Sequence, residues 1–416
     1  MLTFPETIMK DSFSQLFDDH DELHKFLADL DKDTRWESIP AKTVSFVPLD
    51  SLTPEQLLMG GEACYHDTRI SGLPVAVKLD DGRILAIRPY LFKNMKQHHR
   101  DNAAILTDML NCGNVSAMCD HLNMSKPFLK KNILMMTRGQ KISGWFSEFN
   151  ANWGQSAQFK FVEASMHDAF PEFQFGTGEV SHLYSTARYT LGTSLRDGTF
   201  SSCIGDKVLG PYLDAWEAAG GDRAALEKAV PQCWFTTGES GLTSITLSPV
   251  LKMSDGQLFF LGGSLSVNHR GDDSKVWDKF TAFPDQIAVL YQRGMKALSS
   301  LCSRRISNPY ACTTHILLKF RSSVPTDYLK DVASTMEMFY PPEDKEMTCM
   351  AIDVYNAINE MVARAGVKQS PLKRLQNMEL VARLMVANWD DYDKAVPAKV
   401  FGKSTGDDSE VDWLSM

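Results

Sequence analysis

A tight hairpin in the first quarter of the chain limits the choice of fold more than any other feature of the sequence. Two short apolar runs, 74–79 and 83–87, are joined by Asp80-Asp81-Gly82, which places glycine where the turn requires a positive φ. Asp255-Gly256 is a second such turn, inside a strand-rich stretch over 233–269. Because a hairpin joins antiparallel neighbours, these turns predict a mainly antiparallel central sheet.

Helical periodicity occupies both ends of the chain. Residues 7–31 repeat leucine and phenylalanine every three or four positions beside an acidic face, and helices are expected near 325–339, 345–365 and 370–389. A long helix over 274–301 should cover one face of the sheet. We therefore predict an α+β fold, with a mainly antiparallel central sheet, helical N- and C-terminal regions and a helical basic insertion.

The same pattern divides the chain into four parts. They are an acidic N-terminal helix over 1–40, a strand-rich core domain over 41–320, a C-terminal helical region over 321–400 and an acidic tail over 401–416. The helical basic segment, residues 83–141, lies inside the core domain.

Composition is that of an ordinary soluble protein. Of the 416 residues, 44% are apolar and 23% are charged, which excludes a disordered chain and a coiled-coil rod. No apolar run reaches the ~18 residues of a bilayer span, and the first residues do not resemble a signal peptide. The eight cysteines show no pairing rhythm. We expect reduced thiols and a cytoplasmic location.

Positive charge is concentrated in the basic segment. Residues 83–141 contain ten lysines and arginines against three aspartates, a net charge of +7 in a chain whose total is −9. Tyr90, Phe92 and Phe128 lie among these cations, and this mixture is typical of proteins that bind single-stranded nucleic acid. A solvated helical face is the alternative. The residues expected to bind nucleic acid are Arg88, Lys93, Lys96, Arg100, Lys126, Lys130, Lys131, Arg138 and Lys141.

A helix-turn-helix pattern lies within this segment. Cys119 and Leu122 have the small and apolar side chains that its first helix needs, and Asn123 suits its turn. Ser125 can cap a second helix, which is expected over 126–137. An ordinary helical hairpin has the same features, so recognition of duplex DNA and simple packing both remain open.

The tail combines acidic residues with apolar ones. Such tails resemble those of single-stranded-DNA-binding proteins, which compete with DNA for a basic groove and dock replication or repair proteins. A disordered, solubilising end is the alternative. The residues expected to bind such a replication or repair protein are Asp408, Glu410, Asp412, Trp413 and Leu414.

Catalytic and metal-binding motifs are incomplete. The phosphate-loop and serine-nucleophile patterns each lack a required glycine. His20 and His24 lie one helical turn apart beside Asp21 and could hold a metal, but a solvated acidic helix is the simpler interpretation. We therefore expect no cofactor and no metal.

Residues 236–251 read TTGESGLTSITLSPVL, and His269-Arg270-Gly271 follow after a hairpin. This stretch resembles the core signature of the phage/plasmid-like proteins, a mobile-element family of unknown function with a Ser-Glu-x-Gly step and an Arg-His-x-Gly corner. The Cys-Thr-Asn of the family's second strand is missing here. The residues that carry the resemblance are Gly238, Glu239, Ser240, Gly241, His269, Arg270 and Gly271.

The resemblance implies a mobile-element origin rather than a reaction, and the strand-rich core suggests, by analogy, single-strand annealing recombinases. We expect a non-enzymatic protein of a phage or plasmid that binds single-stranded DNA in recombination or replication, in the cytoplasm of a bacterial host cell. Its acidic tail would bind a replication protein of the host or phage. A homo-oligomer is one possible arrangement, and no membrane partner is expected. Two alternatives remain. One is an interaction protein that inhibits a host defence system. The other is a metal-dependent hydrolase or nuclease built from Glu163, Glu179, His182, Glu239 and His269.

Reversing Lys126, Lys130 and Lys131 to glutamate tests the basic segment. The triple variant should lose oligonucleotide binding at about 0.1 M salt, where charges are screened beyond ~10 Å, and it should keep its fold because exposed lysines contribute little to stability. Deleting residues 407–416 should strengthen binding, since the acidic tail competes for the same face. Fluorescence anisotropy with a labelled oligonucleotide measures both effects. Binding equal to that of the parent would mean that the segment is only a solvated surface.

Overall fold

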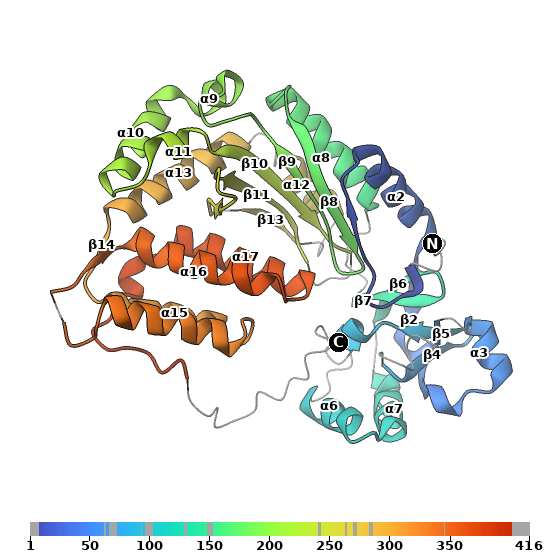
Figure 1. Ribbon diagram of the computed structural model, residues 1–416. Coiled ribbons are helices and arrows are strands. Elements are labelled where there is room, and N and C mark those ends of the chain that lie inside the picture. Colours follow the sequence, from blue (N-terminus) through green and yellow to red (C-terminus); the bar gives the residue numbers. More distant parts are fainter. Residues whose placement is uncertain are drawn as a thin grey trace.

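The structure is a computed structural model. It describes residues 8–61, 64–65, 73–92, 94–95, 103–128, 131–147, 153–239, 243–262, 264–268, 273–282, 286–344 and 346–401. Within these residues, helices and two large, mainly antiparallel sheets lie in separate blocks, so the predicted α+β class is confirmed. Figure 1 shows one sheet in the upper half of the molecule, framed by helices, and the other at the lower right.

The larger sheet has seven strands in the described part of the chain. They run in the order β1, β8, β9, β10, β11, β12, and β13 pairs with β11; every pair is antiparallel. The strands are β1 (Ser14–Phe17), β8 (Gln174–Ser181), β9 (Ser185–Thr190), β10 (Val230–Thr237), β11 (Ile245–Lys252), β12 (Leu258–Phe260) and β13 (Leu265–Val267). The predicted strand-rich stretch over 233–269 is therefore confirmed.

One face of this sheet is apolar and carries the main core. Side chains alternate along a strand, and the strand register places Phe235 beside Ala187 and Leu247 on the same face. Helix α8 (Gln155–Ala169) covers this face, where the rings of Phe159 and Phe235 meet edge to face at 4.9 Å.

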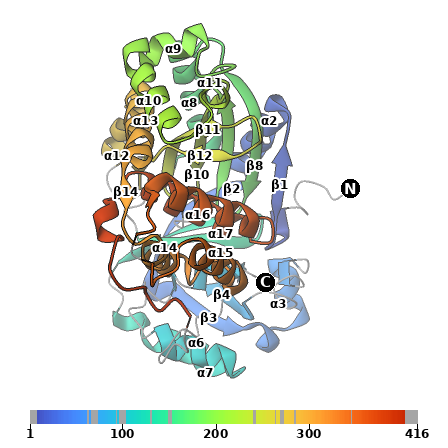
Figure 2. The ribbon, with the colours of Figure 1, turned by 60° about the vertical axis from the view of Figure 1, so that its left-hand side comes forward.

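Further helices surround the large sheet. They are α2 (His20–Asp33), α9 (Gly198–Ile204), α10 (Asp206–Ala218), α11 (Arg223–Glu227), α12 (Asp273–Thr281), α13 (Ile287–Ser303), α14 (Pro309–Leu317), α15 (Thr326–Phe339), α16 (Ala351–Gly366) and α17 (Pro371–Met385). Figure 2 shows α16 and α17 crossing in front of the strands. Two short strands, β14 (Arg305–Ile306) and β15 (Cys349–Met350), pair apart from the sheet.

The smaller sheet has the strand order β2, β6, β7, β5, β4, β3, in which only the β5–β7 pair is parallel among the described residues. Its strands are β2 (Thr34–Pro40), β3 (Val44–Pro48), β4 (Val75–Leu79), β5 (Ile84–Ile87), β6 (Asn132–Arg138) and β7 (Lys141–Ser147), with helices α3 (Pro54–Gly60), α6 (Ala103–Asn111) and α7 (Val115–Met124) around them. The predicted hairpin is β4–β5, and Gly82 in its turn has a φ of +88°. This sheet has an apolar core separate from that of the larger sheet.

The predicted helix over 126–137 is wrong, and with it the helix-turn-helix. A short 3₁₀ turn, Lys126–Phe128, is followed by strand β6. The reason is a period of two: Ile133 and Met135 are buried on one face of β6, and neighbouring strands pair with both of its edges. Ser125 therefore ends α7 rather than capping a second helix.

Three further elements differ from those predicted from the sequence. The predicted N-terminal helix begins only at His20, after Asp19 accepts a hydrogen bond from the Glu22 N–H, and β1 precedes it. The sequence of residues 158–162, QFKFV, alternates polar and apolar side chains and so predicts a strand, but these residues belong to α8, because residues 159, 162 and 166 are buried at helical spacing. The expected helix over 274–301 is divided into α12 and α13.

No helix in the described part of the chain has both the length and the hydropathy that crossing a membrane requires.

Replacing Phe235 with alanine tests the apolar face. The ring is fully buried, so its removal should lower the free energy of unfolding by about 3–5 kcal/mol. Leu16→Ala is the control, because Leu16 is 72% exposed and its loss should change stability by less than about 0.5 kcal/mol. Urea unfolding followed by circular dichroism measures both variants, and equal effects would contradict the assignment of the core.

Candidate nucleic-acid interface

Three of the cations predicted to bind nucleic acid lie in the interior. Arg88, Arg138 and Lys141 are at most 1% exposed, and each is paired with a carboxylate. A charged side chain is rarely buried without such a partner. The prediction that these three contact phosphate is therefore wrong: they hold the protein together instead.

Arg88 and Lys141 share one carboxylate. The guanidinium of Arg88 donates to Asp11 at 3.1 Å, and the Lys141 ammonium donates to the same Oδ1 at 3.0 Å. Arg88 also donates to the Ser143 hydroxyl at 2.8 Å and to the main-chain oxygens of Ile8 and Lys10. These contacts attach the chain that leads into β1 to the ends of β5 and β7, the two middle strands of the smaller sheet.

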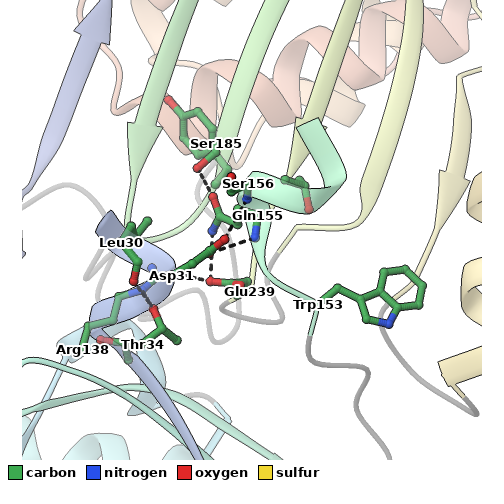
Figure 3. A network of polar contacts seen from close by, with 12 residues as sticks. Leu30, Asp31, Thr34, Arg138, Trp153, Gln155, Ser156, Ser185 and Glu239 are labelled. Carbon is green, nitrogen blue, oxygen red and sulfur yellow. Dashed lines mark hydrogen bonds and ion pairs between the residues drawn. The ribbon is translucent and has the colours of Figure 1, made fainter. Parts of the chain in front are cut away.

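A second buried network joins the two sheets directly (Figure 3). Arg138 at the end of β6 pairs with Glu239, which follows β10 of the larger sheet. The Gln155 amide also donates to Glu239, at 3.1 Å, and accepts from the Ser185 hydroxyl of β9. The two sheets are thus connected by charge and hydrogen bonds between their separate apolar cores.

Asp31 at the end of α2 fixes the start of α8 in the same network. Its carboxylate accepts the N–H groups of Gln155 at 3.0 Å and Ser156 at 2.9 Å, in the first turn of the helix, where negative charge is favoured. The preceding Gly154 leaves the room this needs, since a Cβ there would lie 2.7 Å from the Asp31 carboxylate.

The other predicted cations are less informative. Lys126 donates to the Ser45 hydroxyl at 2.7 Å, and Lys131 is exposed just before β6. Lys93, Lys96, Arg100 and Lys130 lie outside the described residues, as do the tail residues Asp408, Glu410, Asp412, Trp413 and Leu414.

The family-like motif is described only in part. Glu239 belongs to the buried network, and Gly238 packs so closely that a Cβ would lie 2.4 Å from the Leu183 carbonyl oxygen. Ser240, Gly241, His269, Arg270 and Gly271 lie outside the described residues.

The described members of the cluster predicted for a hydrolase do not form one centre. The predicted cluster comprises Glu163, Glu179, His182, Glu239 and His269. Glu179 pairs with Arg374 at 3.1 Å, whereas Glu239 pairs with Arg138. His182 contacts a main-chain oxygen, Glu163 contacts histidines of α2, and His269 lies outside the described residues. The prediction that these residues gather in one buried cluster is therefore wrong for the four that the structure describes.

The second face of the larger sheet is polar and borders an open cleft of about 690 Å³. Along β10, Trp234 and Thr236 point to this face, opposite Arg188 and Thr186 of β9. Helices α16 and α17 form the facing wall, and the β11–β12 turn closes one end. The lining residues are Arg188, Trp234, Asp255, Gly256, Gln257, Leu258, Phe260, Asn356, Asn359, Glu360, Val362, Ala363, Gly366, Arg374 and Met378.

Arg188 is the cation of this cleft that forms no ion pair among the described residues, although the charge of Glu179 acts on it. Its guanidinium carbon lies 4.1 Å above the centre of the Trp234 ring, a cation–π contact, and no carboxylate among the described residues is within ion-pair distance. Burial, and then the positive charge of Arg374, lower the pKa of Arg188. A half-buried cation of this kind is stabilised by any anion that enters the cleft.

The facing wall offers amide groups. Asn359 of α16 donates to the Leu258 carbonyl oxygen at 2.7 Å and so joins the helix to β12. The side-chain oxygen of Asn356 is buried and makes no hydrogen bond within the described residues. Arg374 of α17 reaches across to Glu179 and is neutralised by it.

Sequence reasoning missed this cleft. Its one signal was Arg188, a lone charge in an alternating strand of alanine, tyrosine and threonine. The charge count drew attention instead to residues 83–141, whose cations are partly internal.

No known protein family, curated protein or solved structure matches this chain. The resemblance to the phage/plasmid-like proteins therefore stays a prediction.

The pH dependence of stability tests the buried network. Burial raises the pKa of Glu239 to about 7 from an ordinary value of 4.5, although Arg138 opposes this. As pH rises from about 4.5 to 7, the unfolded chain ionises first, so this carboxyl's contribution to stability is lost. Relative to Glu239→Gln, the wild-type protein should lose up to about 3 kcal/mol of unfolding free energy over this range.

Urea unfolding at several pH values measures the difference. Glu227→Gln is the control, because hydrogen bonds from Arg196 hold the pKa of Glu227 below its usual value and its pH effect has the opposite sign. A pH-independent difference between the wild-type protein and Glu239→Gln would show that Glu239 does not titrate in this range.

Proposed function

We propose that this protein binds single-stranded DNA and that the cleft between the polar sheet face and α16–α17 receives the strand. The observation that carries this proposal is Arg188, a half-buried cation with no carboxylate partner in the described residues. A phosphate group can pair directly with this guanidinium, because an arginine–phosphate pair can form two parallel hydrogen bonds.

The surroundings of Arg188 suit a nucleotide. The Trp234 ring lies 4.1 Å beneath the guanidinium carbon and supports the cation through its face. Leu258 and Met378 give apolar surface for a base or sugar, while Asn356 and Gln257 supply amide groups. A combination of one fixed cation, apolar surface and a few polar groups is typical of small-ligand and nucleotide sites.

The size of the cleft favours a single strand. A volume of about 690 Å³ is that of a pocket for one or two nucleotides, whereas a duplex presents its phosphates on a convex cylinder that cannot enter. A strand held through its phosphates is bound largely without regard to sequence.

The wider role that we propose rests on the sequence. The resemblance to phage and plasmid proteins favours recombination or replication of a mobile element. In that setting, the acidic tail would regulate access to the cleft and bind a replication protein of the host or phage.

Arg188→Met should weaken oligonucleotide binding by about 10- to 100-fold, because one charge-assisted phosphate contact is lost while the side-chain volume is kept. The dependence of log K on log salt should become less steep by about 0.7. Fluorescence anisotropy with a labelled oligothymidylate, repeated over a salt series, measures both.

Arg196→Met is the matched control, because Arg196 is an arginine that pairs with Glu227 away from the cleft. The triple reversal at Lys126, Lys130 and Lys131 separates the two candidate faces. Loss of binding in the triple variant together with wild-type binding by Arg188→Met would overturn the cleft in favour of the basic segment. Absence of binding by the wild-type protein would overturn the proposed function itself.

A further inference from the structure

Two histidines and a glutamate meet between α2 and α8. His20 and His24 lie one turn apart on α2, and Glu163 comes from the middle of α8. Their ligand atoms all lie within 4.8 Å of one another, and they form the one such group of three within the described residues. Figure 1 shows the two helices side by side.

Both histidines approach the same carboxylate oxygen. Glu163 Oε2 lies 2.7 Å from His24 Nε2 and 3.2 Å from His20 Nε2. Ligands of a tetrahedral ion with bonds of about 2.0–2.1 Å are about 3.4 Å apart. A shift of less than about 1 Å in His24 therefore makes room for an ion bound by all three residues.

Neighbouring groups orient two of these three ligands. The Tyr189 hydroxyl donates to the other oxygen of Glu163 at 2.7 Å, which leaves Oε2 directed at the histidines. Nδ1 of His20 lies 3.1 Å from the Asp21 carboxylate, so a proton there leaves Nε2 with a free lone pair. Carboxylate–histidine and hydroxyl–carboxylate contacts of this kind are the usual supports of metal ligands.

His24 provides an independent observation. Both of its ring nitrogens are buried, and neither makes a hydrogen bond of acceptable geometry within the described residues, although Nε2 is close to Glu163. The ring is therefore held by a single polar contact, the close approach of Nε2 to Glu163, while Nδ1 has no partner among the described residues. A bound metal ion satisfies Nε2 through its lone pair.

The electrostatics suit a cation. Glu163 is surrounded by two imidazoles and a hydroxyl that donates to it, and these contacts favour its carboxylate form, which is the form that binds a cation. The site also has access to solvent, because the His20 side chain is 45% exposed.

We propose that His20, His24 and Glu163 bind one divalent transition-metal ion, for which Zn²⁺ is the natural probe. Two imidazole nitrogens and a carboxylate oxygen are ligands that Zn²⁺ and Fe²⁺ accept. Three protein ligands leave a coordination position for water on the exposed side. An open position is characteristic of catalytic rather than structural zinc sites.

Calorimetric titration of ZnCl₂ into the chelator-treated full-length protein tests this site, and Co²⁺ absorption reports the coordination geometry. Cys112→Ser serves as the background, because Cys112 is the exposed thiol among the cysteines whose burial is described. We expect one ion per chain and intense visible bands of four-coordinate Co²⁺. His24→Ala and Glu163→Gln should weaken binding at least 100-fold, and Tyr189→Phe, which keeps all three ligands, should weaken it by about 10- to 100-fold.

His121→Ala is the control, since it removes a histidine of α7 in the other half of the molecule. Thermal unfolding without metal separates loss of the site from loss of the fold. If the ligand variants do not fold, the test is whether Tyr189→Phe binds Zn²⁺ more weakly than the parent. The proposal is overturned if the parent binds no stoichiometric ion, or if folded ligand variants bind as tightly as His121→Ala. These measurements contain no DNA, so their outcome is independent of the function proposed for the cleft.

Discussion

The buried ion pair between Arg138 and Glu239 is the contact on which the arrangement of the two sheets depends. Each sheet has its own apolar core, and hydrophobic packing alone does not specify how two finished cores sit against each other. The ion pair specifies this arrangement, because a buried charge is tolerated only next to its partner. Gln155 and Asp31 extend the specification to α8 and α2. Removal of either charge leaves the other buried and uncompensated, so a single substitution should destabilise the protein even where the intact pair adds little net stability.

This arrangement also determines which surfaces are available. The large sheet uses its apolar face for the core and leaves its polar face towards α16 and α17, and the cleft lies between them. Arg188 can remain without a direct ion pair there because Trp234, the nearby charge of Glu179 and solvent partly compensate its charge. The metal ligands lie on the opposite side of the same sheet, where Tyr189, the next residue along β9, holds Glu163. Alternation along a single strand therefore supplies one residue to each proposed site.

Local signals in the sequence predicted much of the fold. The β4–β5 hairpin, the strands over 233–269 and the C-terminal helices follow from turn chemistry and periodicity. The strand predicted over 158–162 was wrong because alternation over five residues is also compatible with one buried helical face. The helix predicted in place of β6 was wrong because the lysine-rich residues that precede this strand resemble a surface helix. Position in space was the harder problem. A lysine or arginine count cannot distinguish Arg138, which joins two sheets, from a cation that meets solvent, and no local pattern brings Glu163 to histidines about 140 residues away.

Photocrosslinking tests the central claim, that a single strand lies in the cleft, most directly. An oligonucleotide containing 4-thiothymidine is irradiated in complex with the wild-type protein, and the adducts are located by peptide mass spectrometry. The account predicts adducts in peptides of β9, β10, the β11–β12 turn and α16. Adducts confined to residues 83–141 would contradict it.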